Sequence, residues 1–462
     1  MEKSSIMALL FSMLMSIIFM LSHNVFICSS ALKIPLILPN SPESPLYIKN
    51  ITRAQMIENL RRRSKIRARS ISRSRTSNNT HNKFAQLDWA SKQPLHIEEG
   101  SVISLKIGIG TFTTPISYKP YYLYLDTGSE LIWVQCEDCQ RPENRCVGKP
   151  PIIFKNSESS SYHPIPCGTH EFCYPGTCIN GFCSYTSHYG SGTAARGILA
   201  FEKFTLGTED VVLNLAFGCN FFYYGRFTDV GNGILGLGWG KRSFISQIKT
   251  QVHDAFSYCF PHFDKTSSAQ SHGYFAIGSD VVFDDDYSYT TMVTVGGEQH
   301  YYLNLLGISV NGNRLKISPK VFERTGNQKG TVIDSGTTFT TITPIAYKEL
   351  RKVLVAYFKS LGNYVPIKPG KEEFKLDLCY QSSAAAQELP SVTFHFYRAD
   401  LVLKPENVFI SLDNPPNAFC LAMEKYHDNL TILGSYQQSN FKFLYDRLRW
   451  LLFFKPDSCQ GT

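Results

Sequence analysis

Two short segments join an aspartate to glycine and to residues with hydroxyl groups. Residues 126–129 read Asp-Thr-Gly-Ser, and residues 334–337 read Asp-Ser-Gly-Thr. Each glycine permits a tight turn, and the last hydroxyl of each segment can donate a hydrogen bond to the carboxylate. A single such motif is only a turn signal. If Asp126 and Asp334 lie about 3 Å apart, however, they cannot both ionise easily, and we expect them to share one proton.

A pair of carboxyl groups that shares a proton can hydrolyse an amide bond. The ionised member takes a proton from a water molecule, while the protonated member polarises a peptide carbonyl. The reaction requires no covalent intermediate. We therefore predict hydrolysis of polypeptide substrates with no cofactor and no metal.

The surroundings of the two motifs repeat along the chain. An apolar segment precedes each aspartate, and the sequence Ile-Leu-Gly follows at residues 234–236 and again at 432–434. The two aspartates are 208 positions apart. This repetition predicts a duplicated lobe, with one catalytic aspartate contributed by each copy.

Short apolar stretches, separated by turn residues, dominate the chain after about residue 98. Examples rich in Val, Ile, Phe, Tyr and Thr are Val102–Ile109, Tyr121–Leu125, Tyr301–Val310 and Val392–Tyr397. Apolar residues at three- and four-residue spacing predict a helix over Ile345–Leu361. The pattern predicts a mainly β protein.

Residues 1–30 have the features of a secretory signal peptide. Lys3 precedes the uncharged apolar run at 6–22, and small residues follow it. A retained membrane anchor is the alternative, because the run approaches the length of a spanning helix. We expect cleavage, no membrane attachment afterwards, and a secreted protein.

The positive charge of the chain is concentrated near its beginning. Residues 31–83 hold twelve Lys and Arg against two acids, a net charge of +10, whereas the whole chain carries +8. The rest is slightly acidic, which argues against nucleic-acid binding. Residues 31–95 are either a disordered basic arm or a propeptide that covers an acidic site.

Thirteen cysteines are present, and Cys28 falls in the expected signal peptide. The remaining twelve are sufficient for six disulfides in an oxidising compartment. Seven of them crowd into residues 136–183, which predicts a disulfide-stapled, loop-rich insertion. A zinc site at Cys136 and Cys139 is the alternative, although thiolate ligands suit reducing compartments better. The twelve expected disulfide cysteines are Cys136, Cys139, Cys146, Cys167, Cys173, Cys178, Cys183, Cys219, Cys259, Cys379, Cys420 and Cys459.

Residues 185–192 combine tyrosines with glycines in a manner typical of a hairpin tip. Tyr189 and Gly190 lie at its centre. Between the first aspartate motif and the first Ile-Leu-Gly, such a hairpin can serve as a lid that excludes water. The alternative is an ordinary turn.

From about Ser101 to Cys459 the chain resembles the pepsin-like aspartic proteases, most closely their plant nepenthesin-like branch. The resemblance rests on the paired motifs, on Trp133 shortly after the first, and on the cysteine-rich insertion. It implies a bilobal fold of two β lobes related by a pseudo-twofold axis, with a central cleft. The implied roles are catalysis by Asp126 and Asp334, support of the pair by Thr127, Gly128, Ser129, Ser335, Gly336 and Thr337, and flap or substrate contacts by Tyr189, Gly190 and Trp133.

The resemblance also predicts the domain organisation. Residues 31–95 correspond to an inhibitory prosegment, 96–295 to the N-terminal lobe with the insertion, and 296–462 to the C-terminal lobe of a monomer. Cys379 and Cys420 resemble a pair that staples the C-terminal lobe. One departure is Ser191, where relatives usually carry an aspartate in the flap.

The sequence also allows two classes of function other than a protease. A relative of the same fold that binds or inhibits proteins without cutting them tends to lose part of the pair or its hydroxyl neighbours, and all of these are present. A β-rich recognition module would leave the repeated pattern unexplained. Glycosylation is permitted at Asn429, and at Asn50 and Asn78 in the expected prosegment.

Overall fold

The structure is a computed structural model that describes most of the chain after residue 31. The described residues are 32–38, 41–44, 47, 49, 51–73, 103–113, 117–146, 153–174, 176–189, 193–207, 211–224, 232–262, 273–278, 281, 285–293, 299–325, 330–367, 376–382 and 388–459. The expected signal peptide, Asn50, Asn78 and the flap residues 190–192 lie outside them.

Strands dominate the architecture, as the sequence predicts. The N-terminal half contains β2 (Ser104–Ile109), β3 (Lys119–Asp126), β4 (Trp133–Gln135), β5 (His163–Pro164), β6 (Cys178–Ile179), β7 (Phe182–Tyr189), β8 (Thr193–Leu206), β9 (Val211–Tyr224), β10 (Gly233–Gly236), β11 (Ala255–Cys259), β12 (Tyr274–Ile277) and β13 (Ser288–Val293). The C-terminal half contains β14 (Tyr301–Leu303), β15 (Leu305–Val310), β16 (Asn313–Arg314), β17 (Gly330–Ile333), β18 (Thr340–Ile342), β19 (Tyr364–Ile367), β20 (Cys379–Ser382), β21 (Val392–Phe396), β22 (Ala399–Leu403), β23 (Phe409–Leu412), β24 (Ala418–Leu421), β25 (Met423–Lys425), β26 (Leu430–Leu433), β27 (Phe441–Asp446) and β28 (Leu451–Pro456).

Helices are few and mostly short. The described part of the chain begins with strand β1 (Leu32–Ile37) and helix α2 (Arg53–Arg73). Its other helices are α3 (Phe244–Ile248), α4 (Pro344–Leu361), α5 (Pro405–Val408) and α6 (Ser435–Gln438), and its 3-10 turns are η2 (Glu137–Gln140), η3 (Asn156–Glu158) and η5 (Pro319–Val321). The helix predicted over 345–361 is confirmed as α4. It starts one residue earlier because a proline occupies its first turn, and it ends at Gly362, whose φ of 74° suits glycine.

The same crossing of strands recurs in both halves. β10 runs parallel to β3, with Gly236 beside Asp126, and β26 runs parallel to β17, with Leu433 beside Ile333. Asp126 is the last residue of β3, and Asp334 immediately follows β17. Each of these strands is braced by the strand that carries an Ile-Leu-Gly motif. The duplication expected from the sequence is visible in this local topology.

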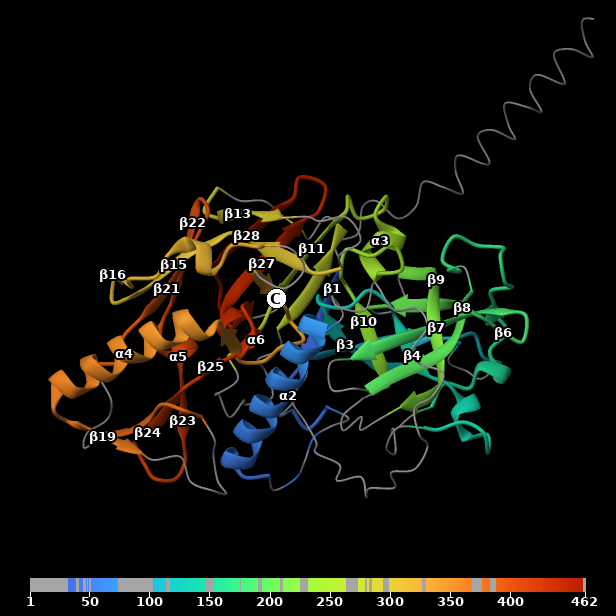
Figure 1. The fold of residues 1–462 in the computed structure, drawn as a ribbon. Coiled ribbons are helices and arrows are strands. Elements are labelled where there is room, and N and C mark those ends of the chain that lie inside the picture. Colours follow the sequence, from blue (N-terminus) through green and yellow to red (C-terminus); the bar gives the residue numbers. More distant parts are fainter. Residues whose placement is uncertain are drawn as a thin grey trace, which may run out of the picture.

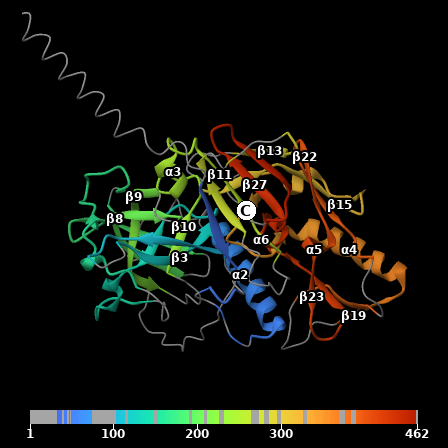
Figure 2. The same cartoon turned by 180° about the vertical axis from the view of Figure 1, so that it is seen from behind.

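The same large sheet joins elements that are distant in sequence. β11 pairs with β27, and β13 pairs with β28, so that the last strands of the chain lie beside strands of the first half. The first strand, β1, pairs with β12 and with β2. Figure 2 shows β1 near β11 and β27, at the middle of the molecule.

The basic segment contains a packed helix, so the disordered-arm interpretation is wrong for residues 53–73. α2 lies in the middle of the molecule, between the strands of the first half and those of the second (Figure 1). It buries a face that includes Ile57, Leu60, Ser64, Ala68 and Ile71. Apolar burial on this face supplies the main stabilisation of the docked helix.

All twelve cysteines expected to form disulfides do so. The pairs are Cys136–Cys219, Cys139–Cys146, Cys167–Cys178, Cys173–Cys183, Cys259–Cys459 and Cys379–Cys420. The last pair confirms the staple of the C-terminal lobe. Cys136 and Cys139 are each oxidised with other partners, so they do not present a pair of thiolates for zinc.

Candidate active site

The two aspartate motifs lie against each other and are tied by crossed hydrogen bonds. The backbone N–H of Thr127 donates to Ser335 Oγ at 3.0 Å, and the N–H of Ser335 donates to Thr127 Oγ1 at 2.9 Å. The Ser335 hydroxyl also donates to the backbone oxygen of Leu125 at 2.8 Å. These bonds fix the position of each loop relative to the other, because every donor and acceptor in them is buried.

Each carboxylate is held in the same way by its own loop. Asp126 accepts hydrogen bonds from the Gly128 N–H at 3.0 Å and from the Ser129 hydroxyl at 2.5 Å. Asp334 accepts the equivalent bonds from Gly336 at 3.1 Å and from Thr337 at 2.6 Å. The structure thus brings together all eight residues of the two motifs, which the sequence predicted as one site.

The glycines of the motifs are required by close approach. A methyl group added to Gly128 would lie 2.6 Å from Asp334 Oδ1, and one added to Gly336 would lie 2.8 Å from Asp126 Oδ1. Behind the loops, the N–H of Leu237 donates to the Asp126 carbonyl at 2.8 Å. The N–H of Ser435 donates to the Thr337 carbonyl at 2.7 Å. The two Leu-Gly strands therefore back the loops as expected.

Arg67 of α2 occupies the space in front of the paired carboxylates. Its Nη2 donates to Asp126 Oδ1, and also to Asp334 Oδ1 at 3.5 Å, while its Nε donates to Asp334 Oδ2 at 3.0 Å. One guanidinium therefore bridges both acids. Its side chain is 12% exposed, so solvent screens these contacts weakly.

The two carboxyl groups differ in acidity. Burial raises the pKa of Asp126, and the nearby charge of Asp334 adds to this rise, against the opposing effect of Arg67. Burial also acts upward on the pKa of Asp334, but the Arg67 guanidinium and the Thr337 hydroxyl outweigh it, and the pKa lies below its ordinary value. One member thus favours the protonated form and the other the ionised form, as expected for a shared proton.

Two further contacts dock α2 beside the aspartates. The Ser64 hydroxyl accepts a hydrogen bond from the N–H of Phe339, just after the second motif, at 2.7 Å. Glu424 forms ion pairs with Arg61 at 3.3 Å and with Lys65 at 3.0 Å. Neither Arg67 nor Glu424 was predicted from the sequence, where Arg67 is one of many cations in the basic segment.

The predicted lid forms a hairpin from β7 and β8. Tyr189 is its last paired residue and faces Thr193 across the strands. The tip itself lies outside the described residues. Trp133 is buried, and its ring lies edge-on to Tyr223 with centroids 5.8 Å apart. Whether Trp133 supports the flap tyrosine stays a prediction.

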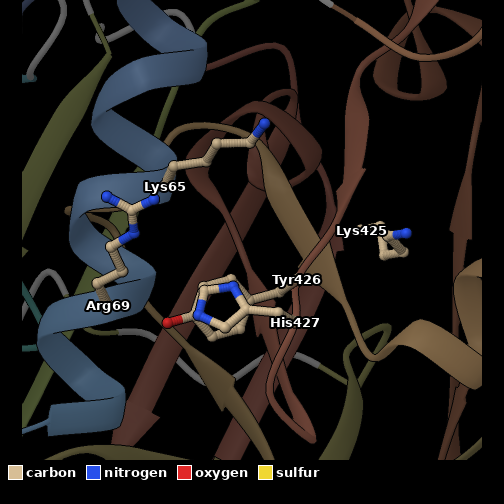
Figure 3. Close-up of a pocket in the computed structure, with 5 residues that line it drawn as sticks. All are labelled: Lys65, Arg69, Lys425, Tyr426 and His427. Carbon is tan, nitrogen blue, oxygen red and sulfur yellow. The ribbon is translucent and has the colours of Figure 1, made fainter.

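A small cavity of about 220 Å³ lies at the edge of α2. It is lined by Lys65, Arg69, Lys425, Tyr426 and His427. Figure 3 shows Lys65 and Arg69 on the helix, with Tyr426 and His427 facing them and Lys425 further away. The cavity marks the boundary between the basic helix and the segment that follows β25.

Comparisons with known proteins agree with this geometry. The chain matches the family described as xylanase inhibitor N-terminal over residues 105–279, and the family described as xylanase inhibitor C-terminal over residues 300–456. It is 30% identical to aspartic proteinase nepenthesin-2 of Nepenthes gracilis, over 90% of this chain and 88% of that protein. It is 31% identical to aspartyl protease AED1 of Arabidopsis thaliana, over 86% and 81% of the two chains.

The protein therefore belongs to the pepsin-like aspartic protease family. Within it, the chain groups with the nepenthesin-like plant members. The crystal structure of edgp matches with a TM-score of 0.59, covering 78% of this chain and 92% of that one at 16% identity. This match supports the fold alone, which is the mainly β, bilobal fold predicted from the sequence.

Two observations bear on the surface of the chain. Among the described residues, no helix is long and apolar enough to cross a membrane. Asn429 is exposed immediately before β26, whereas Thr431 of the same glycosylation sequence is buried within that strand. Glycosylation at Asn429 stays a prediction.

Proposed function

We propose that this protein is the precursor of a secreted aspartic endopeptidase that cleaves peptide bonds at acidic pH. The observation that carries the proposal is the arrangement of Asp126 and Asp334, whose loops are locked by crossed hydrogen bonds and whose carboxylates share the Arg67 guanidinium. Relatives named as aspartic proteinases support it. The six disulfides support an oxidising compartment, such as the secretory route to the apoplast or vacuole.

Catalysis follows from the single proton that two such close carboxyl groups share. With α2 displaced, the ionised carboxylate takes a proton from a water molecule held between the acids. The protonated partner donates to the carbonyl oxygen of the scissile bond, and the water oxygen attacks the carbonyl carbon. The resulting tetrahedral intermediate collapses as a proton passes to the leaving nitrogen. Because the loops are rigidly braced, no reorganisation of the carboxylates is needed.

α2 supports the prosegment interpretation of residues 31–95. Arg67 occupies the position that the water and the substrate carbonyl need, so the docked helix blocks the reaction. Arg67 lowers the pKa of Asp334, and its stabilising contribution is present above the ordinary pKa of aspartate. The contribution is lost as the pH falls through the lowered value, because protonation then removes the charge that Arg67 binds. Acid therefore weakens the block.

A protein that binds partners without cutting them is the alternative, since the matching families are described by the words xylanase inhibitor. Inhibition requires no particular arrangement of carboxylates. Here both aspartates, both glycines and all four hydroxyl groups of the motifs are present and hydrogen-bonded. This completeness favours the protease.

The test is an assay of the purified full-length chain after acid treatment, with denatured protein as substrate. We expect cleavage at acidic pH, inhibition by a statine-type mimic of the tetrahedral intermediate, and no cleavage by the Asp334→Asn variant. Cleavage by that variant at the wild-type rate would reject the catalytic pair. Inhibition of a xylanase without any proteolysis would favour the binding protein.

A further inference from the structure

Glu424 is a buried acid beside the proposed prosegment helix. It lies on β25, its side chain is 6% exposed, and its Oε1 accepts contacts from Arg61 at 3.3 Å and Lys65 at 3.0 Å. Both cations belong to α2. Its second oxygen, Oε2, is buried without a hydrogen-bond partner in the described part of the chain. Glu424 therefore depends for its charge partners on a segment that must leave before catalysis.

The two ion pairs do not fully offset the cost of burying this acid. Burial raises the pKa of Glu424 despite the opposing effects of Lys65 and Arg61, so burial disfavours its charge more than the two cations favour it. A group with a raised pKa contributes stability at low pH and loses that contribution as the pH rises. Above this pKa, the charge of Glu424 therefore carries a net cost to the folded protein, which the contacts with α2 only reduce.

Glu424 also lies within reach of a peptide that occupies the catalytic site. Arg61 and Lys65 flank one side of the buried face of α2, and Arg67 flanks the other. Arg61 and Arg67 are six residues apart, which corresponds to about 9 Å along a helix. An extended peptide covers that distance in roughly three residues. β25 also pairs with β18, which closely follows the second aspartate motif.

We propose that Glu424 is a specificity residue that binds a Lys or Arg side chain of the substrate, two to four residues from the scissile bond. The inference rests on the proposed protease function and deepens it. In the precursor, Arg61 and Lys65 occupy the position beside Glu424 that this substrate side chain would take. When α2 leaves, the carboxylate is left with neither ion pair, and a basic side chain restores the contact that it loses.

Within the described residues, the neighbouring cation on β25 does not replace Arg61 and Lys65. Lys425 is the next residue, and successive side chains of a strand point to opposite faces. Figure 3 shows Lys425 lying away from Lys65 and Arg69. A substrate cation is therefore the partner that fits best.

The test compares the cleavage of matched peptides by the protein obtained after acid treatment of the full-length chain. The two peptides of a pair compete in the same reaction. Each pair differs only by Lys or norleucine, placed in turn at each of four positions on either side of the scissile bond. The ratio of kcat/KM within a pair is independent of the amount of active enzyme, so incomplete maturation does not affect it. We expect a ratio of about tenfold in favour of Lys at one position, which is the effect of one charge-assisted contact.

Glu424→Gln should bring that ratio close to one. Asp413→Asn is the matched control, because Asp413 also faces α2, 3.8 Å from Arg53, but is 74% exposed. The control should keep the ratio. A ratio that is unchanged in Glu424→Gln, or a wild-type protein that shows no preference for Lys at any position, would overturn the proposal.

A second measurement needs no catalysis and separates this inference from the proposed function. The same peptides are bound to the full-length Asp334→Asn variant at acidic pH, with and without Glu424→Gln, and followed by fluorescence anisotropy. Tighter binding of the Lys peptide that requires Glu424 supports the inference even if no cleavage occurs. Equal binding of both peptides rejects it even if the protein proves to be a protease.

Discussion

The two aspartate loops have nearly the same internal geometry but opposite acidity. The hydrogen bonds within the first loop measure 3.0 and 2.5 Å, and those within the second measure 3.1 and 2.6 Å. Yet the pKa of Asp126 is raised and that of Asp334 is lowered. The loops themselves cannot explain a difference of opposite sign.

The difference comes from what lies around the loops. Arg67 contacts both acids, but its Nε donates to Asp334, and the buried His300 adds a further lowering effect on the pKa of Asp334. The charge of Asp334 in turn raises the pKa of Asp126. Duplication therefore supplies the matched pair, while the charge of one acid on the other, together with Arg67 and His300, makes the pair unequal. With α2 docked, the same cation also occupies the space in front of both carboxylates.

Filling the close approach between the loops should have the largest effect. Gly128→Ala and Gly336→Ala each place a methyl group less than 3 Å from the opposite carboxylate, and we expect a loss of at least about 100-fold in kcat/KM. Because the two approaches are equivalent, the two variants should lose similar activity. Thermal unfolding verifies that each remains folded, and near-wild-type activity in a folded variant would contradict the geometry.

Removing Arg67 should come next. Arg67→Gln removes the positive charge that favours the ionised form of Asp334. The release of α2 then no longer requires protonation of that acid. We expect the pH at which the full chain becomes active to rise by about one unit, measured as proteolysis after incubation over a pH series. Arg69→Gln, two residues along the same helix, should leave the activation pH in place. An unchanged activation pH for Arg67→Gln would mean that Arg67 does not control release.

The two hydroxyl groups test whether the loops become equivalent once α2 has left. Ser129→Ala and Thr337→Val each remove a donor that lowers the pKa of the adjacent acid. The acidic limb of the kcat/KM profile of the matured protein should therefore move to higher pH by about half a unit in both variants. A shift confined to one variant would show that the asymmetry persists without the helix.

Glu424→Gln should have the smallest effect on the precursor. Because burial raises the pKa of Glu424, a neutral side chain of the same shape avoids a cost at pH 7. We expect the free energy of unfolding at pH 7 to equal that of wild type or exceed it by up to about 1 kcal/mol, with no difference below pH 4. Chemical denaturation measures this. A loss of about 3 kcal/mol at pH 7 would instead indicate a net stabilising ion pair.

Much of the fold and of the aspartate site could be predicted because the signals are local. The strand that ends in Asp126, the three- and four-residue spacing in α4 and the repeated Ile-Leu-Gly all lie within short stretches of sequence. One expected strand, Tyr301–Val310, is divided at Asn304 into β14 and β15, which pair with different neighbours. Such a division depends on tertiary pairing and leaves no local mark.

The features that the sequence did not predict depend on contacts between residues that are far apart in the chain. Arg67 and Asp334 are 267 positions apart, and nothing in a run of arginines distinguishes the one that contacts the acids. A weak signal did exist for the helix, since Ile57, Leu60, Ser64, Ala68 and Ile71 recur at three- and four-residue intervals. Five of the six disulfide pairs were likewise beyond reach, because spacing alone permits many connectivities.

The pairing of β11 with β27 constrains the order in which the molecule can be assembled. Tyr258 and Tyr445 meet hydroxyl to hydroxyl at 2.8 Å across these strands, and Cys259 is bonded to Cys459, 200 residues later. During synthesis, β11 must therefore wait for almost the whole remaining chain to leave the ribosome. Contacts of such long range slow folding, and until they form the β11 edge and the Cys259 thiol stay open to wrong partners. Chaperones and thiol oxidoreductases have this interval in which to act.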